Sequence, residues 1–275
     1  MPESSANIST RVSLRWPPEP AFEYTDTTSL SVGGWYVDLR INKQTGGLDW
    51  AMAGQRIVES EDPPIVSFTH LIDSLQSFDT TDQGTFKTLP NGDDFESGKM
   101  PRPDLPGAPL RDYEEIWRKI PLPQTVGNKL GYSWILESQD SIQCHGAKLA
   151  LDWLQDTEED DVEEVQNVKT FLGRVPGHFI ALRQCLRYKR DGLGGKWVVK
   201  TGGEVSARRE EWDALSAKDA RVKYLVGKEA KELPSLITGG ELVGFAGEGE
   251  EGWNELGEVV RIGDEKYVLR AFEVR

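Results

Sequence analysis

Cysteine is scarce in this chain: its 275 residues include only Cys144 and Cys185. Two cysteines are too few for a disulfide framework or a four-cysteine zinc site. The three histidines, His70, His145 and His178, show no ligand spacing with the cysteines. Cys144 and His145 are adjacent, so on a strand they point to opposite faces. The sequence therefore predicts no disulfide, no metal, no cofactor and no cysteine–histidine nucleophile.

Long apolar runs and an excess of positive charge are also missing. No stretch approaches about 18 uninterrupted apolar residues, and residues 1–9 lack the basic start and apolar block of a signal peptide. Lysine and arginine total 32 against 46 aspartates and glutamates, a formal net charge of −14. Nucleic acids and anionic membranes favour clustered cations, so this balance argues against both as partners. We expect a soluble protein of the cytosol, with the nucleus as the alternative.

Aromatic residues, glycine and proline are plentiful. The chain has 9 Trp, 9 Phe, 7 Tyr, 28 Gly and 15 Pro, a composition that favours many turns over long helices. Alternating apolar residues predict short strands, among them 11–16, 35–40, 65–72, 132–136, 198–201 and 266–272. In 35–40 the alternation is expected to point Trp35, Val37 and Leu39 inward. Gly263-Asp264 predicts a tight hairpin.

An internal repeat indicates two similar units. The segment 34–40 (GWYVDLR) resembles 177–183 (GHFIALR), and 46–50 (GGLDW) resembles 194–197 (GGKW). The simplest account is two all-β units in tandem, because regular short strands bounded by Gly, Asp and Pro indicate barrels or sandwiches.

The proline-rich stretch 120–127 predicts the boundary between the units, because proline cannot join a ladder. We expect a disordered tail over 1–9, a first barrel over 10–122 and a second barrel over 128–275. Short helices are expected at 216–219, which has the form of a capping box, and at 228–233, which precedes Pro234.

The barrel interiors are the first candidate ligand site. Eight-stranded barrels are either packed solid or hold one small ligand, and the expected interior residues are Trp35, Trp50, His178 and Trp197. In the repeat His178 takes the place of Trp35, where an imidazole could bind a ligand or haem iron. A histidine hydrogen-bonded in the core is the favoured alternative.

Three further patterns have simpler interpretations. The segment 247–252 matches G-x-G-x-x-G, but its three glutamates would repel phosphate, which indicates an acidic loop. The pairs Glu114-Glu115 and Glu210-Glu211 could suggest a glycosidase. We interpret them instead as exposed strand residues beside a buried tryptophan.

The segment 156–164 (DTEEDDVEE) is the densest acidic run. Like-charge repulsion predicts a solvated loop. Such a loop could also meet a basic partner surface, including that of a kinase. The candidate partner-binding residues are Asp156, Glu158, Glu159, Asp160 and Asp161.

A set of short motifs resembles the fungal HRI family. They follow the family's order along the chain: 33–40 (GGWYVDLR), 49–54 (DWAMAG), 95–98 (FESG), 113–117 (YEEIW), 172–174 (LGR) and 227–230 (GKEA). The resemblance implies two tandem calycin/lipocalin-like antiparallel β-barrels, a cytoplasmic and alternatively nuclear location, and no enzymatic activity. It also implies binding to casein kinase I, with a component of the endoplasmic-reticulum translocon as a further candidate partner.

These observations give two hypotheses of different classes. The leading one is a non-enzymatic cytosolic interaction protein that binds casein kinase I. The alternative is a binder of a small apolar ligand, or less favoured of haem, inside one of the barrels.

Overall fold

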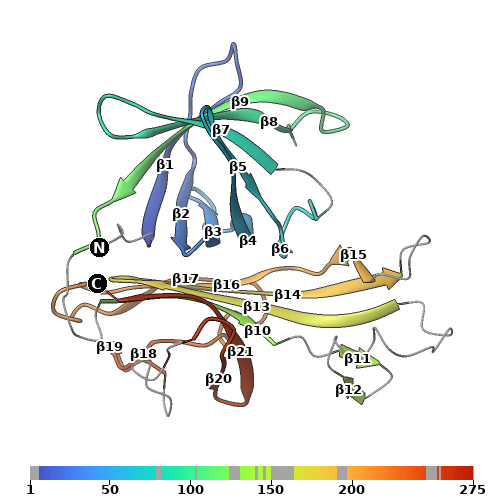
Figure 1. Cartoon of the computed structure of the whole chain (residues 1–275), viewed down its shortest axis with the longest axis vertical. Coiled ribbons are helices and arrows are strands. Elements are labelled where there is room, and N and C mark those ends of the chain that lie inside the picture. The colour runs from blue at the N-terminus through green and yellow to red at the C-terminus, as the bar shows by residue number, and fades with distance from the viewer. Residues whose placement is uncertain are drawn as a thin grey trace.

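The computed structural model describes residues 6–78, 82–102, 104–123, 131–139, 142–144, 147–149, 164–190, 197–245, 253 and 255–274. Its regular elements are antiparallel strands in three sheets (Figure 1). Within these ranges no helix has the length and hydropathy needed to cross a bilayer. The predicted fold class of two calycin/lipocalin-like β-barrels in tandem is confirmed.

Nine strands form the first unit: β1 (Asn7–Arg15), β2 (Thr25–Val32), β3 (Trp35–Asn42), β4 (Leu48–Glu61), β5 (Pro64–Phe68), β6 (Ile72–Asp73), β7 (Asp82–Thr88), β8 (Asp94–Pro101) and β9 (Leu110–Ile120). Eight of them run in the order β3-β2-β1-β9-β8-β7-β5-β4, and β3 also pairs with β4. That pairing closes the barrel and leaves it without an edge strand. β6 pairs with β4 outside the ring.

Ten strands form the second sheet: β10 (Tyr132–Ser138), β11 (Ile142–Cys144), β12 (Ala147–Leu149), β13 (Glu164–Val175), β14 (His178–Arg190), β15 (Trp197–Gly202), β16 (Ser206–Glu211), β17 (Arg221–Val226), β20 (Val259–Ile262) and β21 (Glu265–Val274). Its main path is β17-β16-β14-β13-β10-β21-β20. A small third sheet joins β18 (Ile237–Thr238) to β19 (Glu241–Leu242). Among the described strands, β17 and β20 are the two ends of the main path.

Tight turns at glycine set the register of the hairpins. Gly33 and Gly34 have φ values of 56° and 81°, which suit the type I′ turn that joins β2 to β3. Gly177, with φ 87°, follows Pro176 between β13 and β14. Gly263-Asp264 joins β20 to β21, as predicted.

The sequence repeat corresponds to a repeated arrangement of strands. β3 follows the glycine turn and pairs with β4, where Arg40 lies opposite Trp50. β14 likewise follows a glycine turn and pairs with β15, where Arg190 lies opposite Trp197. The strand order around the two copies is therefore alike, although the repeat position of Arg40 is Arg183, which lies opposite Ser206 of β16 and not opposite β15.

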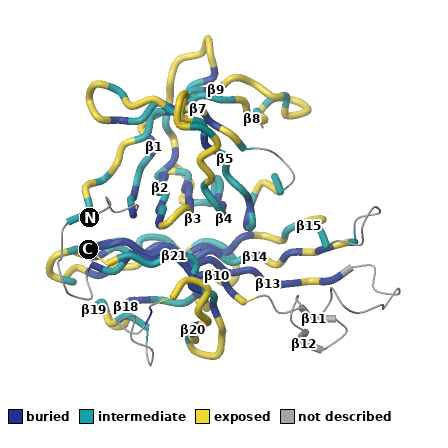
Figure 2. The backbone as a smooth tube through the Cα atoms, in the orientation of Figure 1, coloured by how far each residue is buried: buried dark blue, intermediate teal, exposed yellow. Residues whose placement is uncertain are grey.

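One apolar core lies between the units. The outer face of strands β1–β4 packs against a face of the second sheet, and Figure 2 shows the buried segments of both units along this boundary. Its buried members include Ile8, Leu30, Val32, Val37, Leu39, Ile41, Ala51, Ala53 and Ile72 from the first unit and Ile135, Phe171, Val175, Ile180, Leu182, Ala207 and Ala271 from the second. We call this cluster the shared core. The repeat positions of Val37 and Leu39 are Ile180 and Leu182, so equivalent faces meet.

The expectation that Trp35, Val37 and Leu39 point into the barrel is wrong. These three residues pack in the shared core, and the alternate residues of β3 face the barrel interior. Alternation identifies residues that share a face, but either face of a barrel strand can be buried when a second sheet covers the outside.

The second unit has a further core of its own on the opposite face of its sheet. Aromatic rings dominate it, with ring centroids 6.1 Å apart for Trp134 and Phe179 and 5.5 Å apart for Trp134 and Trp253. Leu172, Ala181 and other buried apolar residues complete this core.

Two local predictions differ from the structure. Segments 216–219 and 228–233 form turns and bends, not helices. At the first site Ala217 and Asp219 have φ values of 57° and 56°, which a right-handed helix does not accommodate. The tail predicted over 1–9 does not hold for residues 7–9, which begin β1. They pair with β2 there, and Ile8 enters the shared core.

A substitution at Gly173 can test the contact between the units. A Cβ at this position would lie 3.1 Å from Ile135 Cδ1 and 3.2 Å from Val37 Cγ2. We expect Gly173→Val to lower the free energy of unfolding by about 1–3 kcal/mol through overpacking, as measured by urea denaturation. The control is Gly203→Val, because a Cβ on this exposed glycine comes no closer than 3.4 Å to its neighbours, the carbonyl oxygen and Cβ of Cys185. Equal losses in the two variants would contradict a packed contact at Gly173.

Candidate functional site

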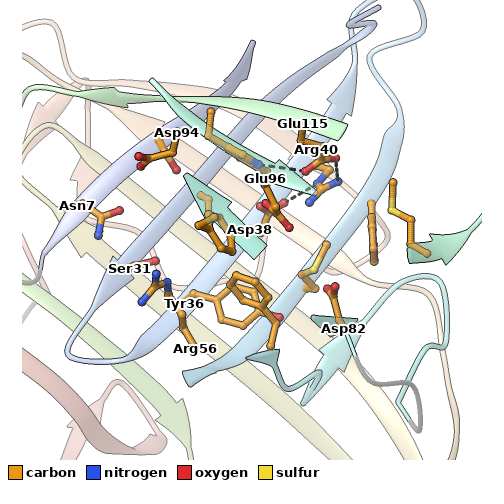
Figure 3. A pocket seen from close by; sticks show the side chains of 18 of the residues that line it. Asn7, Ser31, Tyr36, Asp38, Arg40, Arg56, Asp82, Asp94, Glu96 and Glu115 are labelled. Atoms are coloured by element: carbon orange, nitrogen blue, oxygen red, sulfur yellow. Dashed lines mark hydrogen bonds and ion pairs between the residues drawn. The ribbon is translucent and has the colours of Figure 1, made fainter. Parts of the chain in front are cut away.

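A cavity of about 350 Å³ lies inside the first barrel (Figure 3). Seven of the eight barrel strands direct alternate residues into it, and β5 contributes Phe68. The lining comprises Asn7, Ser9, Ser29, Ser31, Tyr36, Asp38, Arg40, Trp50, Met52, Arg56, Phe68, Asp82, Phe86, Asp94, Glu96, Met100, Tyr113, Glu115, Trp117 and Lys119. Since the apolar faces of β1–β4 pack in the shared core, their polar faces are left for the cavity.

One wall of the cavity is a ladder of small polar side chains. Asn7 lies opposite Ser31, and Ser9 lies opposite Ser29, across the β1–β2 pair. Cross-strand partners on one face have Cβ atoms about 5 Å apart. This wall therefore offers a row of hydroxyl and amide groups to whatever occupies the cavity.

A buried ion pair lies in the wall of the cavity. Arg40 Nε donates to Asp38 Oδ1 at 3.0 Å, and its guanidinium lies 4.6 Å from the ring centroid of Trp50. Burial alone would lower the pKa of Arg40, but the Asp38 and Glu115 carboxylates outweigh it and raise that pKa. Arg40 is therefore a permanent cation held against an aromatic face.

A second buried arginine extends this network. Arg11 Nη1 donates to Glu115 Oε1 at 2.7 Å, and Arg11 Nε donates to Glu23 at 2.6 Å. Trp117 Nε1 donates to the other oxygen of Glu115 at 3.0 Å. With both oxygens bonded, Glu115 is held in one orientation at the cavity wall.

Glu96 is a buried carboxyl whose hydrogen-bond partner is neutral. Tyr113 Oη donates to Glu96 Oε1 at 2.6 Å. Two glycines make room for the pair, because a Cβ on Gly84 would lie 2.6 Å from Glu96 Oε1 and one on Gly98 would lie 2.9 Å from the Tyr113 ring. Burial, reinforced by the charge of Glu115, raises the pKa of Glu96 to about 8. The group is therefore mostly protonated at neutral pH.

His70 connects the cavity wall to the second unit. Its Nδ1 lies 2.6 Å from Asp73 Oδ2, and its Nε2 lies 3.1 Å from Asp82 Oδ2. Burial alone would lower the pKa of His70, but these two bonds outweigh it and raise the pKa to about 9. Asp73 also accepts from Trp50 Nε1 at 2.9 Å, and its backbone exchanges two hydrogen bonds with the Gln184 side chain of β14.

Of the four predicted interior residues, the structure places Trp50 in the cavity wall. Trp35 lies at the boundary of the units, stacked on Phe171 with centroids 6.2 Å apart and covered by Arg270. Trp197, the first residue of β15, belongs to a small cluster that also contains Phe78. Both lie away from the cavity lining.

His178 also lies outside the cavity, at the start of β14. Its Nδ1 is 4.0 Å from Glu211. Burial, with the nearby charge of Arg209, lowers the pKa of His178 to about 4, so the ring is neutral. Among the described residues no cluster of histidine, cysteine and carboxylate side chains is arranged to hold a metal ion. The candidate partner residues Asp156, Glu158, Glu159, Asp160 and Asp161 lie outside the described residues.

The interpretation of the two glutamate pairs as exposed is wrong, because Glu115 and Glu210 are buried and Glu114 and Glu211 are half-buried. Glu115 is buried in the cavity network, and Glu114 pairs with Arg15 outside it. Glu210 is fully buried and accepts from Arg208 and from the Leu236 amide. Each carboxylate can be buried because hydrogen-bond donors satisfy both of its oxygens.

Asp38, Arg40 and Glu96 are functional candidates that sequence reasoning missed. Tyr36, Asp38 and Arg40 alternate with the residues that the sequence predicts to point inward, so that prediction leaves them outside the barrel. A run of three large polar residues opposite a strongly apolar face was the available signal.

The fold and the cavity define this chain as a protein of two calycin-like β units with a charged cavity in the first. The family model described as Protein HRI1 matches residues 7–187. The chain therefore belongs to the HRI1 family, as the motifs predicted.

One solved structure shares the fold over nearly the whole length. It is the crystal structure of uncharacterized protein YLR301w from Saccharomyces cerevisiae, with a TM-score of 0.59, 12% identity and coverage of 98% of this chain and 99% of that chain. At this identity the likeness shows the fold alone. Comparison with curated proteins finds no match.

The raised pKa of His70 predicts a pH-dependent stability. The folded protein binds this proton more tightly than the unfolded chain, so the contribution is complete below about pH 6.5 and is lost as pH rises to about 9. In the variant Glu96→Gln, we expect the free energy of unfolding to fall by about 3 kcal/mol over this pH range. The double variant Glu96→Gln/His70→Gln should not show this fall. Urea denaturation at several pH values measures it, and the Glu96→Gln background removes the titration of that carboxyl. Parallel curves for the two proteins would contradict a protonated His70.

Proposed function

We propose that this protein is a non-enzymatic binding protein that holds one small polar molecule in the cavity of its first barrel. The cavity carries the proposal: its volume of about 350 Å³ lies in the range of small-molecule sites. An eight-stranded barrel has an interior that can hold one small ligand.

The chemistry of the lining supports a polar ligand over the apolar one expected from the sequence. Asp38, Arg40, Glu96 and Glu115 all border the space. An apolar molecule would remove water from these groups without replacing its hydrogen bonds, which is unfavourable. A molecule with its own donors and acceptors can replace them.

A binding role is also supported by how the reactive groups are engaged. His70 bonds to two aspartates, Asp73 and Asp82, and not to a serine or cysteine. Asp38 and Glu115 are fixed by arginines. These pairs hold the wall in one arrangement before a ligand arrives, which favours binding.

Native mass spectrometry of the purified protein tests this function. We expect a co-purifying small molecule in the wild type, and its loss in Ser29→Phe, which fills the cavity. The control is Thr238→Phe, at an exposed position of the second unit, which should retain the molecule. If the wild type shows neither an added mass nor a change in tryptophan fluorescence with a library of small polar metabolites, the proposal is wrong.

Family membership favours a second candidate function, a cytoplasmic partner of casein kinase I. The sequence supplies an acidic run, 156–164, that suits a basic surface of such a kinase.

A pull-down with casein kinase I tests this candidate. Changing Asp156, Glu158, Glu159, Asp160 and Asp161 to their amides should reduce the captured kinase at least about tenfold, because screened charge attraction is removed. The control neutralises five other acids of the described surface, Glu59, Glu61, Asp62, Glu204 and Glu232. Equal capture by all three proteins would contradict a contact through the acidic run.

A further inference from the structure

Two ionisable side chains remain without an oppositely charged partner when the ion pairs of the cavity lining are counted. Asp38 and Glu115 pair with arginines, Asp82 pairs with His70, and Asp94 pairs with Lys119. Among the described residues, Glu96 and Arg56 have no ion pair.

Both groups line the same cavity, and Figure 3 shows both side chains there. Glu96 is buried, whereas Arg56 is partly exposed. Their separation exceeds the 4.0 Å of an ion pair, since none forms between them. The cavity therefore offers a carboxyl group and a guanidinium cation that are held apart.

Aromatic rings border the space near these groups. Phe86 lies directly opposite Glu96 across the β7–β8 pair. Phe68 lies with its ring centroid 6.4 Å from Phe86 and 5.4 Å from Tyr36, in an edge-on contact with the latter. These faces suit the apolar body of a ligand, and they attract a cation placed over them.

We propose that the cavity binds a small zwitterion with an apolar or aromatic body, whose ammonium group pairs with Glu96 and whose carboxylate pairs with Arg56. This inference rests on the proposed binding function and adds the class of ligand. The body would lie against the rings of Tyr36, Phe68 and Phe86, and the hydroxyl ladder of β1 and β2 would bond to remaining polar atoms.

Binding of the ammonium group is coupled to the proton on Glu96. The groups that act on this carboxyl are Glu115 and Tyr113 on β9, Arg40 on β3, Asp82 on β7 and Arg56 on β4. The ammonium offsets the repulsion from Glu115 and Asp82, so Glu96 gives up its proton, and the hydroxyl of Tyr113 still donates to it. Affinity should therefore rise with pH up to about 8.

Three probes with one phenylethyl body separate the two charged contacts: L-phenylalanine, 2-phenylethylamine and 3-phenylpropionate. Isothermal titration calorimetry at pH 8 should show phenylalanine binding at least about tenfold tighter than either of the others, since each contributes one fewer charge-assisted bond. Equal affinity of the amine would overturn the role of Arg56, and equal affinity of the propionate would overturn the role of Glu96.

Variants make the assignment specific to these residues. Glu96→Gln should abolish the preference for phenylalanine over phenylpropionate, and Arg56→Gln should abolish the preference over phenylethylamine. Each preference is a ratio within one variant, so a change in folded fraction cancels. Lys87→Gln, at an exposed position of β7, should keep both preferences. If no probe binds while native mass spectrometry detects another ligand in the cavity, the zwitterion is wrong and the binding function stands.

Discussion

The packing of two apolar sheet faces against each other is the constraint on which the rest of this structure depends. Strands β1–β4 turn an apolar face outward, and the second sheet covers it with the equivalent residues of its own motif. Val37 and Leu39 thus meet a surface that includes Ile180 and Leu182. Fully burying a side chain of this size contributes about 1.5–3 kcal/mol, so the shared core is a principal source of stability for both units.

This packing allows the first barrel to have a polar interior. In an isolated barrel the apolar residues of each strand must fill the inside, because no other surface can cover them. Here they are buried on the outside, and the interior positions of β3 are Tyr36, Asp38 and Arg40. The repeat positions in the second unit include Phe179 and Ala181, which lie in an aromatic core. Equivalent strands therefore enclose a charged cavity in one unit and a packed core in the other.

Local rules were enough to predict part of this arrangement from the sequence. The hairpin at Gly263-Asp264, the strand at 132–136 and the repeat of β3 in β14 follow from alternation and turn residues, which act over a few positions. The face of Trp35 could not be predicted, because it depends on contact with Phe171, far away in the chain. The burial of Glu115 likewise depends on Arg11, which reaches it only once β1 and β9 pair. Charge burial is a property of the assembled partners, and strand periodicity does not reveal it.

The ion pairs around the cavity orient its side chains more than they stabilise the fold. Buried ion pairs contribute little net stability, since desolvation offsets most of their attraction, so an apolar filling could serve folding equally well. What the ion pairs supply is orientation: Asp38 and Trp50 fix Arg40, and Arg11 and Trp117 fix Glu115. Asp73 extends this order outward, because it holds Trp50 and His70 on one side and Gln184 of the second unit on the other. The second unit therefore acts as the support that keeps one wall of the cavity in place.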